Sequence, residues 1–227
     1  DHCVTGVQTC ALPISATPDP LVIDFDLIRT APLQLNVAGV GDLLSIHTAT
    51  RDWELAHRAG VDPQGFSARD VAAARGILAD VREKADALAA AADEGLTAIV
   101  EGYMRVNTLC LPVGHYRVEE GSEHYLFYEL EERLGRPFLH GQIIGLGVLL
   151  MSRLQENEPE QVLQFLRRVG LDYQPKTMGI DRATLRASLR ALPQFVRKRN
   201  FWYTIIDQRP IDDAWIDAAI SDLEFAD

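Results

Sequence analysis

"FLHGQIIGLGVLLM", residues 138–151, is the longest apolar stretch of this 227-residue chain. A membrane-spanning helix needs about 20 consecutive apolar residues, so this stretch is too short to cross a bilayer. It also contains His140. We interpret it as a buried helix, in which the "GLG" at 145–147 serves packing because it lies within the helix and does not follow a strand.

The sequence on both sides of this stretch also shows helical periodicity, divided by glycine, proline and capping signals. For one segment, Ser67 is the expected first residue and Asp70 its capping partner. Besides 138–156, the predicted helices cover 41–60 (capped by Asp42 or its neighbours), 67–92, 96–109, 122–134, 159–169, 181–192 and 211–223. No repeat with a period of about 20–50 residues is present, which excludes a solenoid. We predict a mainly α protein, with an all-helical domain over 38–227.

The stretch "PLVIDFDLI" (20–28) is the exception, because its short run of β-branched and apolar residues is typical of a strand. A lone strand cannot satisfy its own edges. We therefore expect residues 21–26 to be the last strand of a sheet whose other strands belong to a missing N-terminal α/β domain. Residues 15–37 are assigned to this remnant strand and a linker.

The stretch "VTGVQTCALPI" (4–14) has no apolar periodicity and lacks the regions of a signal peptide. Read back through the genetic code, it resembles a translated short-read sequencing adapter. We expect 1–14 to be derived from an adapter, with a disordered leader as the alternative. The native sequence would then begin at about Ser15, and the upstream part of the gene would be missing.

Composition narrows the possible partners and the compartment. The formal net charge is −11, without a basic stripe, so a nucleic-acid partner is not expected. Beyond residue 14 the only cysteine is Cys110, which leaves no disulfide framework and favours a reducing compartment. We expect a cytoplasmic protein without a membrane span, and a homo-oligomer.

Two histidines stand where an apolar helix face is expected to begin. His124 follows "EEGSE" and His140 precedes a glycine, and Asp42 follows "GVG". Two imidazoles and one carboxylate that converge would form a zinc-type site open to a substrate. From spacing alone this signal is weak, because histidines in helices usually serve structure.

Four stretches in order resemble the C-terminal half of the sn-glycerol-1-phosphate dehydrogenases, within the glycerol dehydrogenase, iron-containing alcohol dehydrogenase and dehydroquinate synthase-like superfamily. The resemblance covers about residues 20–155. The stretches are "VIDFDLIRTAP", "VAGVGDLLSIHTATRDWELA", "EEGSEHYLFYELE" and "FLHGQIIGLGVLLM". The resemblance implies the all-helical metal-binding domain of a dehydroquinate synthase-like fold.

The resemblance also implies the chemistry. Asp42, His124 and His140 match the family's ligands of one catalytic divalent metal, with zinc expected and iron or nickel as alternatives. NAD(P) would be held by an upstream Rossmann-like domain with a Gly-Gly-Gly turn, a triplet that this chain lacks. The implied reaction is metal-assisted hydride transfer between sn-glycerol-1-phosphate and dihydroxyacetone phosphate. We expect the chain to be truncated and inactive alone.

Further residues are candidates for supporting roles. Glu123, Asp52 or Glu120 could orient the imidazoles. A phosphate-bearing substrate needs a cation or a helix N-terminus, and Arg117 and His115 are candidates, although a solvated turn explains them equally well.

Two other functions remain open. A dehydroquinate synthase-like sugar phosphate cyclase shares the fold, metal and NAD, but carries glutamate where this chain has Asp42, followed shortly by a lysine that "GDLLSIHTATRD" lacks. The second is a stand-alone, non-enzymatic helical module. The residue type at position 42 favours a dehydrogenase of a polyol or polyol phosphate.

Overall fold

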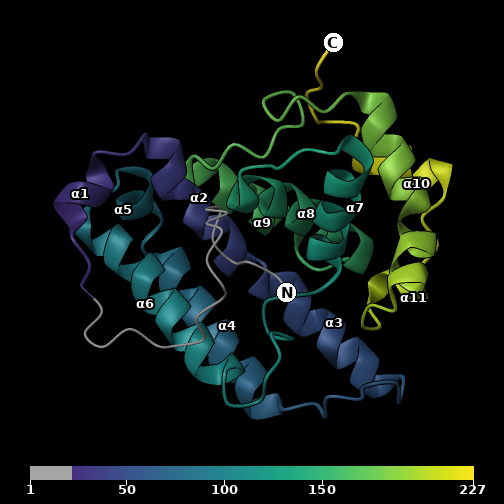
Figure 1. Ribbon diagram of the computed structural model, residues 1–227, viewed down its shortest axis with the longest axis horizontal. Helices are drawn as coiled ribbons and strands as arrows, with labels where there is room; N and C mark the ends of the chain where they lie inside the picture. The colour runs from purple at the N-terminus through teal and green to yellow at the C-terminus, as the bar shows by residue number, and fades with distance from the viewer. Residues whose placement is uncertain (1–21) are drawn as a thin grey trace.

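The structure is a computed structural model that describes residues 22–227 (Figure 1). This part of the chain is built from helices, and its only β pairing is an isolated bridge between Asp181 and Ala226. The helices are α1 (Phe25–Arg29), α2 (Leu33–Leu44), α3 (Ile46–Arg58), α4 (Ala68–Glu83), α5 (Ala85–Ala89), α6 (Asp93–Cys110), α7 (Ser122–Leu134), α8 (His140–Gln155), α9 (Pro159–Val169), α10 (Arg182–Arg199), α11 (Ile205–Gln208) and α12 (Asp213–Ala219). The predicted mainly α class is confirmed.

The strand predicted over 20–28 is wrong for the residues that the structure describes. Residues 25–29 form α1, because the Asp24 side chain accepts a hydrogen bond from the Leu27 backbone N–H at 3.1 Å and caps the first turn. No strand partner is present among residues 22–227, and Val22 and Leu27 are 82% and 68% exposed. The prediction for 1–14 and the first residues of the predicted strand lie outside the described residues.

Several predicted helix boundaries also need correction. Asp42 does not cap a helix but lies near the end of α2, and the predicted helix over 41–60 is the end of α2 followed, after Ser45, by α3. The predicted helix over 67–92 is interrupted at Lys84. Its predicted start is confirmed, because the Ser67 side chain accepts a hydrogen bond from the Asp70 N–H at 3.2 Å. α10 continues through Pro193 to Arg199.

α8 forms the centre of the fold and is buried along nearly its whole length, as predicted from its sequence. It contacts α2, α7 and α9, which surround it in Figure 1. Gly145 and Gly147 lie inside α8 and allow close approach. At Gly147 a Cβ atom would lie 2.7 Å from the Glu123 carbonyl oxygen, so the start of α7 rests directly on α8.

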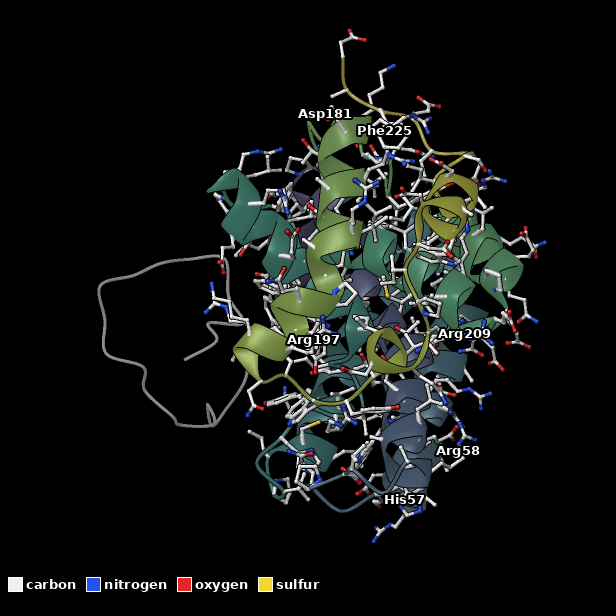
Figure 2. The ribbon with its side chains drawn as sticks, turned by 90° about the vertical axis from the view of Figure 1, so that its right-hand side faces the viewer. His57, Arg58, Asp181, Arg197, Arg209 and Phe225 are labelled. Atoms are coloured by element: carbon white, nitrogen blue, oxygen red, sulfur yellow. The ribbon has the colours of Figure 1, made fainter. Side chains whose placement is uncertain are left out.

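α10 covers one face of α7 and packs in turn against α11 and α12. Figure 2 shows α10 running along this face from Asp181 towards Arg197, with Phe225 beside its beginning. The guanidinium of Arg182 lies 4.4 Å from the centre of the Phe225 ring, which attaches the end of the chain to the start of α10. No helix within residues 22–227 combines the length and hydropathy that crossing a membrane requires.

Candidate metal centre

Two glycines bring α2 and α8 into backbone contact and thereby place Asp42 beside His140. A Cβ atom on Gly41 would overlap the carbonyl of Gly141, and a Cβ atom on Gly141 would overlap the carbonyl of Ala38. Since Gly41 precedes Asp42 and Gly141 follows His140, the helices cross at the two predicted ligands. No larger residue fits at either glycine without moving a helix.

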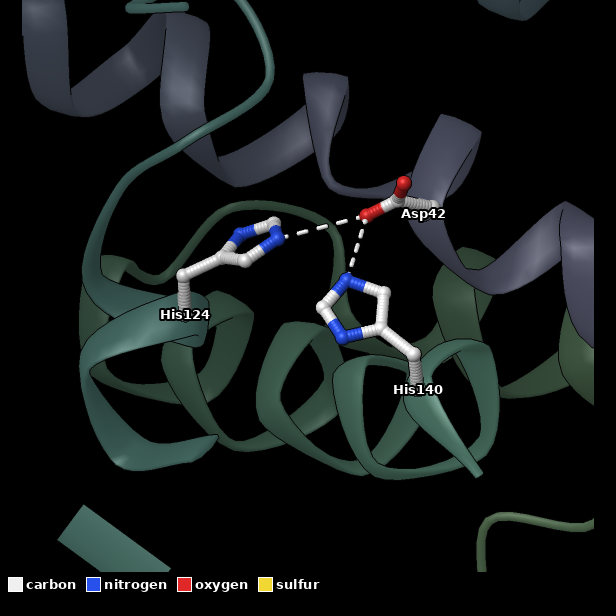
Figure 3. Close-up of side chains that lie close together, drawn as sticks. All are labelled: Asp42, His124 and His140. Atoms are coloured by element: carbon white, nitrogen blue, oxygen red, sulfur yellow. Dashed lines mark hydrogen bonds and ion pairs between the residues drawn. The ribbon is translucent and has the colours of Figure 1, made fainter. Parts of the chain in front are cut away.

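Asp42, His124 and His140 converge from α2, α7 and α8 (Figure 3). The Oδ1 atom of Asp42 lies 3.2 Å from Nε2 of His124 and 3.1 Å from Nε2 of His140. One ligand atom from each residue lies within 4.8 Å of the other two. The structure thus brings together all three residues predicted as ligands.

Burial and opposite charges set the protonation of this cluster. Burial alone would raise the pKa of Asp42, but hydrogen bonds from His124 and His140 outweigh it and lower that pKa. Burial alone would lower the pKa of His124, but Asp42 and Glu123 together raise it well above its ordinary value. The buried carboxylate therefore stays ionised and attracts positive charge, whether protons on the imidazoles or a cation.

Of the three residues predicted to orient the imidazoles, Glu123 contacts a histidine directly. Its Oε1 atom lies 3.0 Å from Nδ1 of His124 and accepts a hydrogen bond from the Gly121 N–H at 2.6 Å. Its Oε2 atom accepts a hydrogen bond from the Thr48 hydroxyl at 2.6 Å. Glu120 instead accepts a hydrogen bond from the Tyr128 hydroxyl at 2.9 Å.

Asp52 acts on the backbone around the centre. Its Oδ2 atom accepts from the N–H of Ser122, the first residue of α7, at 2.9 Å. Its Oδ1 atom accepts from Nε2 of Gln155 and from the Ile205 N–H, both at 2.9 Å. Burial and the charge of Glu123 raise the pKa of Asp52 to about 6. This one carboxylate joins α3 to α7, α8 and α11.

His115 and Arg117 lie in an aromatic cluster, and their contacts do not include the three converging residues. Arg117 is 1% exposed, with its guanidinium 5.1 Å from the Trp202 ring centre and Nη2 donating to the Tyr203 carbonyl at 3.4 Å. The His115 ring centre lies 5.4 Å from that of Trp53. Their predicted role in binding phosphate stays a prediction.

Two further residues, Tyr103 and Glu119, lie near Asp42 and were not predicted from the sequence. The Tyr103 hydroxyl of α6 donates to the Gly39 carbonyl at 2.8 Å, and burial together with the charge of Asp42 raises its pKa well above the ordinary value. Burial and the same charge raise the pKa of Glu119 to about 8. No spacing signal connects these positions with Asp42, because they come from elements distant in sequence.

The fold and the site together define an all-helical domain with a candidate metal centre of one aspartate and two histidines. No protein-family model matches the chain. The chain is similar to proteins of several organisms that are each named glycerol-1-phosphate dehydrogenase [NAD(P)+]. The protein of Thermococcus kodakarensis is 33% identical over 171 residues, which are 74% of this chain and 48% of that protein. The protein of Hyperthermus butylicus is 31% identical over 196 residues, which are 86% of this chain and 54% of that protein. The protein of Methanosarcina barkeri is 29% identical over 175 residues, which are 77% of this chain and 49% of that protein.

The chain spans about half the length of these curated relatives. Over most of its own length it is homologous to glycerol-1-phosphate dehydrogenases, which confirms the resemblance predicted from the sequence.

Proposed function

We propose that this chain is the metal-binding part of an NAD(P)-dependent glycerol-1-phosphate dehydrogenase. The reaction would interconvert sn-glycerol-1-phosphate and dihydroxyacetone phosphate by hydride transfer. The observation that carries the proposal is the convergence of Asp42, His124 and His140 in a chain similar to enzymes of that name. The dehydrogenase names of the relatives support this reaction over that of a sugar phosphate cyclase.

The residues present fit a divalent cation. One carboxylate oxygen and two imidazole nitrogens are ligands that zinc accepts, with iron or nickel as alternatives, and three protein ligands leave a position for a substrate. Around the start of α7, the carboxylates of Asp42, Asp52 and Glu123 are buried together with His124 and Arg117. A cation bound by Asp42 and His124 would add positive charge beside these buried carboxylates.

Within this proposal, a cation bound at the centre would supply Lewis-acid chemistry and so lower the pKa of the substrate hydroxyl. Asp42 and the Nε2 atoms of His124 and His140 would bind the cation. His140 borders the more open side of the centre, because its side chain is 43% exposed whereas that of His124 is 7% exposed. The substrate would therefore approach on the His140 side.

The rest of the enzyme is part of the proposal. NAD(P) would be bound by a nucleotide-binding domain corresponding to the half of the relatives outside the similarity, with 15–37 as its remnant and linker and 38–227 as the metal-binding domain. Four apolar side chains are exposed on α1, on α2 and just before α8, and they support contact of these positions with that domain. They are Leu27, Leu33, Leu35 and Leu139. The present chain would be inactive without that domain.

The proposal also includes partners and a compartment. We propose a small polyol phosphate as substrate, with His115 and Arg117 as candidates to bind its phosphate, and no nucleic-acid partner. The enzyme would work in the cytoplasm as a homo-oligomer.

Metal titration of the 227-residue chain tests the centre directly. We expect wild type to bind one equivalent of Zn²⁺, and Asp42→Ala and His140→Ala each to lose that equivalent, because each removes one of three ligands. His57→Ala is the matched control. The His57 ring stacks on that of Phe66, with the ring centres 4.6 Å apart, at the end of α3, and α3 supplies none of the three ligands. Full Zn²⁺ stoichiometry in both ligand variants would contradict the assignment.

A further inference from the structure

The two histidines of the candidate centre differ in how firmly the protein holds them. His124 has contacts at both ring nitrogens, with Asp42 at Nε2 and Glu123 at Nδ1. His140 contacts Asp42 through Nε2, and almost half of its side chain is exposed. His124 is therefore the ligand whose orientation the surrounding protein determines.

The Glu123 carboxylate is completely buried, and both of its oxygens are engaged. Oε1 faces Nδ1 of His124 at 3.0 Å and accepts the Gly121 N–H at 2.6 Å. A carboxylate oxygen accepts hydrogen bonds, so Nδ1 must carry the proton at this contact. Nε2, on the opposite side of the ring, faces Asp42 and is the nitrogen that would give up its proton when a cation binds.

Thr48 fixes the other end of this carboxylate. Its hydroxyl donates to Oε2 of Glu123 at 2.6 Å, and Thr48 is itself fully buried in α3. The close approach of Gly147 in α8 fixes the Glu123 backbone from another side. The carboxylate thus has little freedom to turn away from His124.

We propose that Glu123 is a positioning residue that, supported by the Thr48 hydroxyl, orients His124 and sets the affinity of the centre for a divalent cation. The proposal rests on the metal site of the proposed function. A charge-assisted hydrogen bond at Nδ1 makes the imidazole more basic at Nε2 and restricts its rotation, and both effects strengthen a bond to a cation there. Thr48 acts on the cation only through Glu123.

Zn²⁺ affinities of the full chain, measured by competition with a chromophoric chelator, test this role. We expect Glu123→Gln to weaken Zn²⁺ binding about 10- to 100-fold, with stoichiometry retained, because the amide replaces a charged acceptor by a neutral one. Glu120→Gln is the matched control, since it removes a carboxylate charge three residues away that contacts Tyr128 and neither histidine. We expect the Zn²⁺ affinity of Glu120→Gln to stay within about twofold of wild type, because the charge of a group without direct contact to the ligands is screened.

Thr48 provides a second pair of variants that leave every charge in place. Thr48→Val removes the donor to Oε2 in a side chain of the same shape, and we expect several-fold weaker binding of Zn²⁺. Thr48→Ser keeps the hydroxyl, and we expect it to bind Zn²⁺ with wild-type affinity. In the zinc-loaded chain, NMR should show the His124 Nδ1 proton shifting upfield in Glu123→Gln, as a charge-assisted hydrogen bond becomes a neutral one.

The outcomes separate this inference from the proposed function. If wild type binds Zn²⁺ and Glu123→Gln binds it as tightly as Glu120→Gln does, the positioning role is overturned and the metal centre stands. Equal Zn²⁺ affinity of Thr48→Val and Thr48→Ser overturns the positioning role even if Glu123→Gln folds poorly. If wild type binds no divalent metal, both proposals are overturned.

Discussion

At the scale of single residues, His47 shows a buried histidine held neutral by its partners. Nε2 lies 2.8 Å from the Asn157 carbonyl, which only accepts, and Nδ1 lies 3.3 Å from the Arg82 guanidinium, which only donates. Burial, and then the charges of Arg82 and Arg75, lower the pKa of His47, against opposing effects of Asn157 and Glu158.

This lowered pKa predicts a loss of stability in acid. Below the unfolded-state pKa of about 6.5 the unfolded chain takes up a proton at His47 that the folded chain refuses, so the free energy of unfolding falls as the pH decreases. Urea denaturation of wild type and His47→Gln between about pH 5 and 8 measures the effect. We expect the glutamine variant to lose less stability on acidification, and parallel curves would refute the assignment.

The sequence identified the three converging residues because "GVGD", "GSEH" and "LHG" are local motifs that resemble a family's ligands. It placed Glu123 among three candidates for orienting an imidazole but could not select it. Thr48 and Tyr103 were missed, since their contacts with Glu123 and Gly39 depend on how helices pack. Contacts within a few residues are readable from a motif, whereas contacts across helices are not.

At the scale of elements, the crossing of α2 and α8 depends on two glycines. A methyl group on Gly141 would overlap the Ala38 carbonyl, which is backbone and cannot rotate aside. Glycine inside a helix normally weakens it relative to alanine. In α2 and α8 the glycines permit the close crossing that brings Asp42 beside His140.

We therefore expect Gly141→Ala to lower the free energy of unfolding by about 1–3 kcal/mol or more, through overpacking, and to weaken Zn²⁺ binding by separating two ligands. Gly76→Ala in α4 is the control, because a Cβ there meets nothing within 4 Å. It should raise stability by about 0.5–1 kcal/mol. Chemical denaturation and Zn²⁺ titration of both variants decide the matter, and equal stability gains would contradict the close crossing.

Helices with clear local signals were predicted well. α7 and α9 match their predicted bounds of 122–134 and 159–169, since a glycine or proline marks their ends. α10 was predicted to stop before Pro193, but it continues because Leu192 and Val196 are both buried against the rest of the fold. The strand over 20–28 was predicted from residue type alone, and the Asp24 cap favours a helix there.

At the scale of the whole molecule, the candidate centre joins helices that are far apart in sequence. A cation that binds the folded chain alone adds about 2.7 kcal/mol to the free energy of unfolding at a concentration 100 times its Kd. We expect Zn²⁺ to raise the Tm of wild type, and a chelator to reverse the change. Asp42→Ala should show no such rise in differential scanning calorimetry, and an equal rise in this variant would place the stabilising zinc elsewhere.

The mainly α class could be predicted because helical periodicity is local in sequence. The assembly of the site could not, since it depends on packing between positions up to 98 residues apart, as for Asp42 and His140.

Asp52, the carboxylate that joins four helices, has a consequence for the time course of folding. Its partners lie 70, 103 and 153 residues further along the chain. Closing such long loops costs entropy before any contact repays it, so we expect these hydrogen bonds to form late in folding. Interactions that form after the rate-limiting step slow unfolding and leave the speed of folding nearly unchanged. We therefore expect Asp52 to govern how long the folded chain survives, and not how fast it folds.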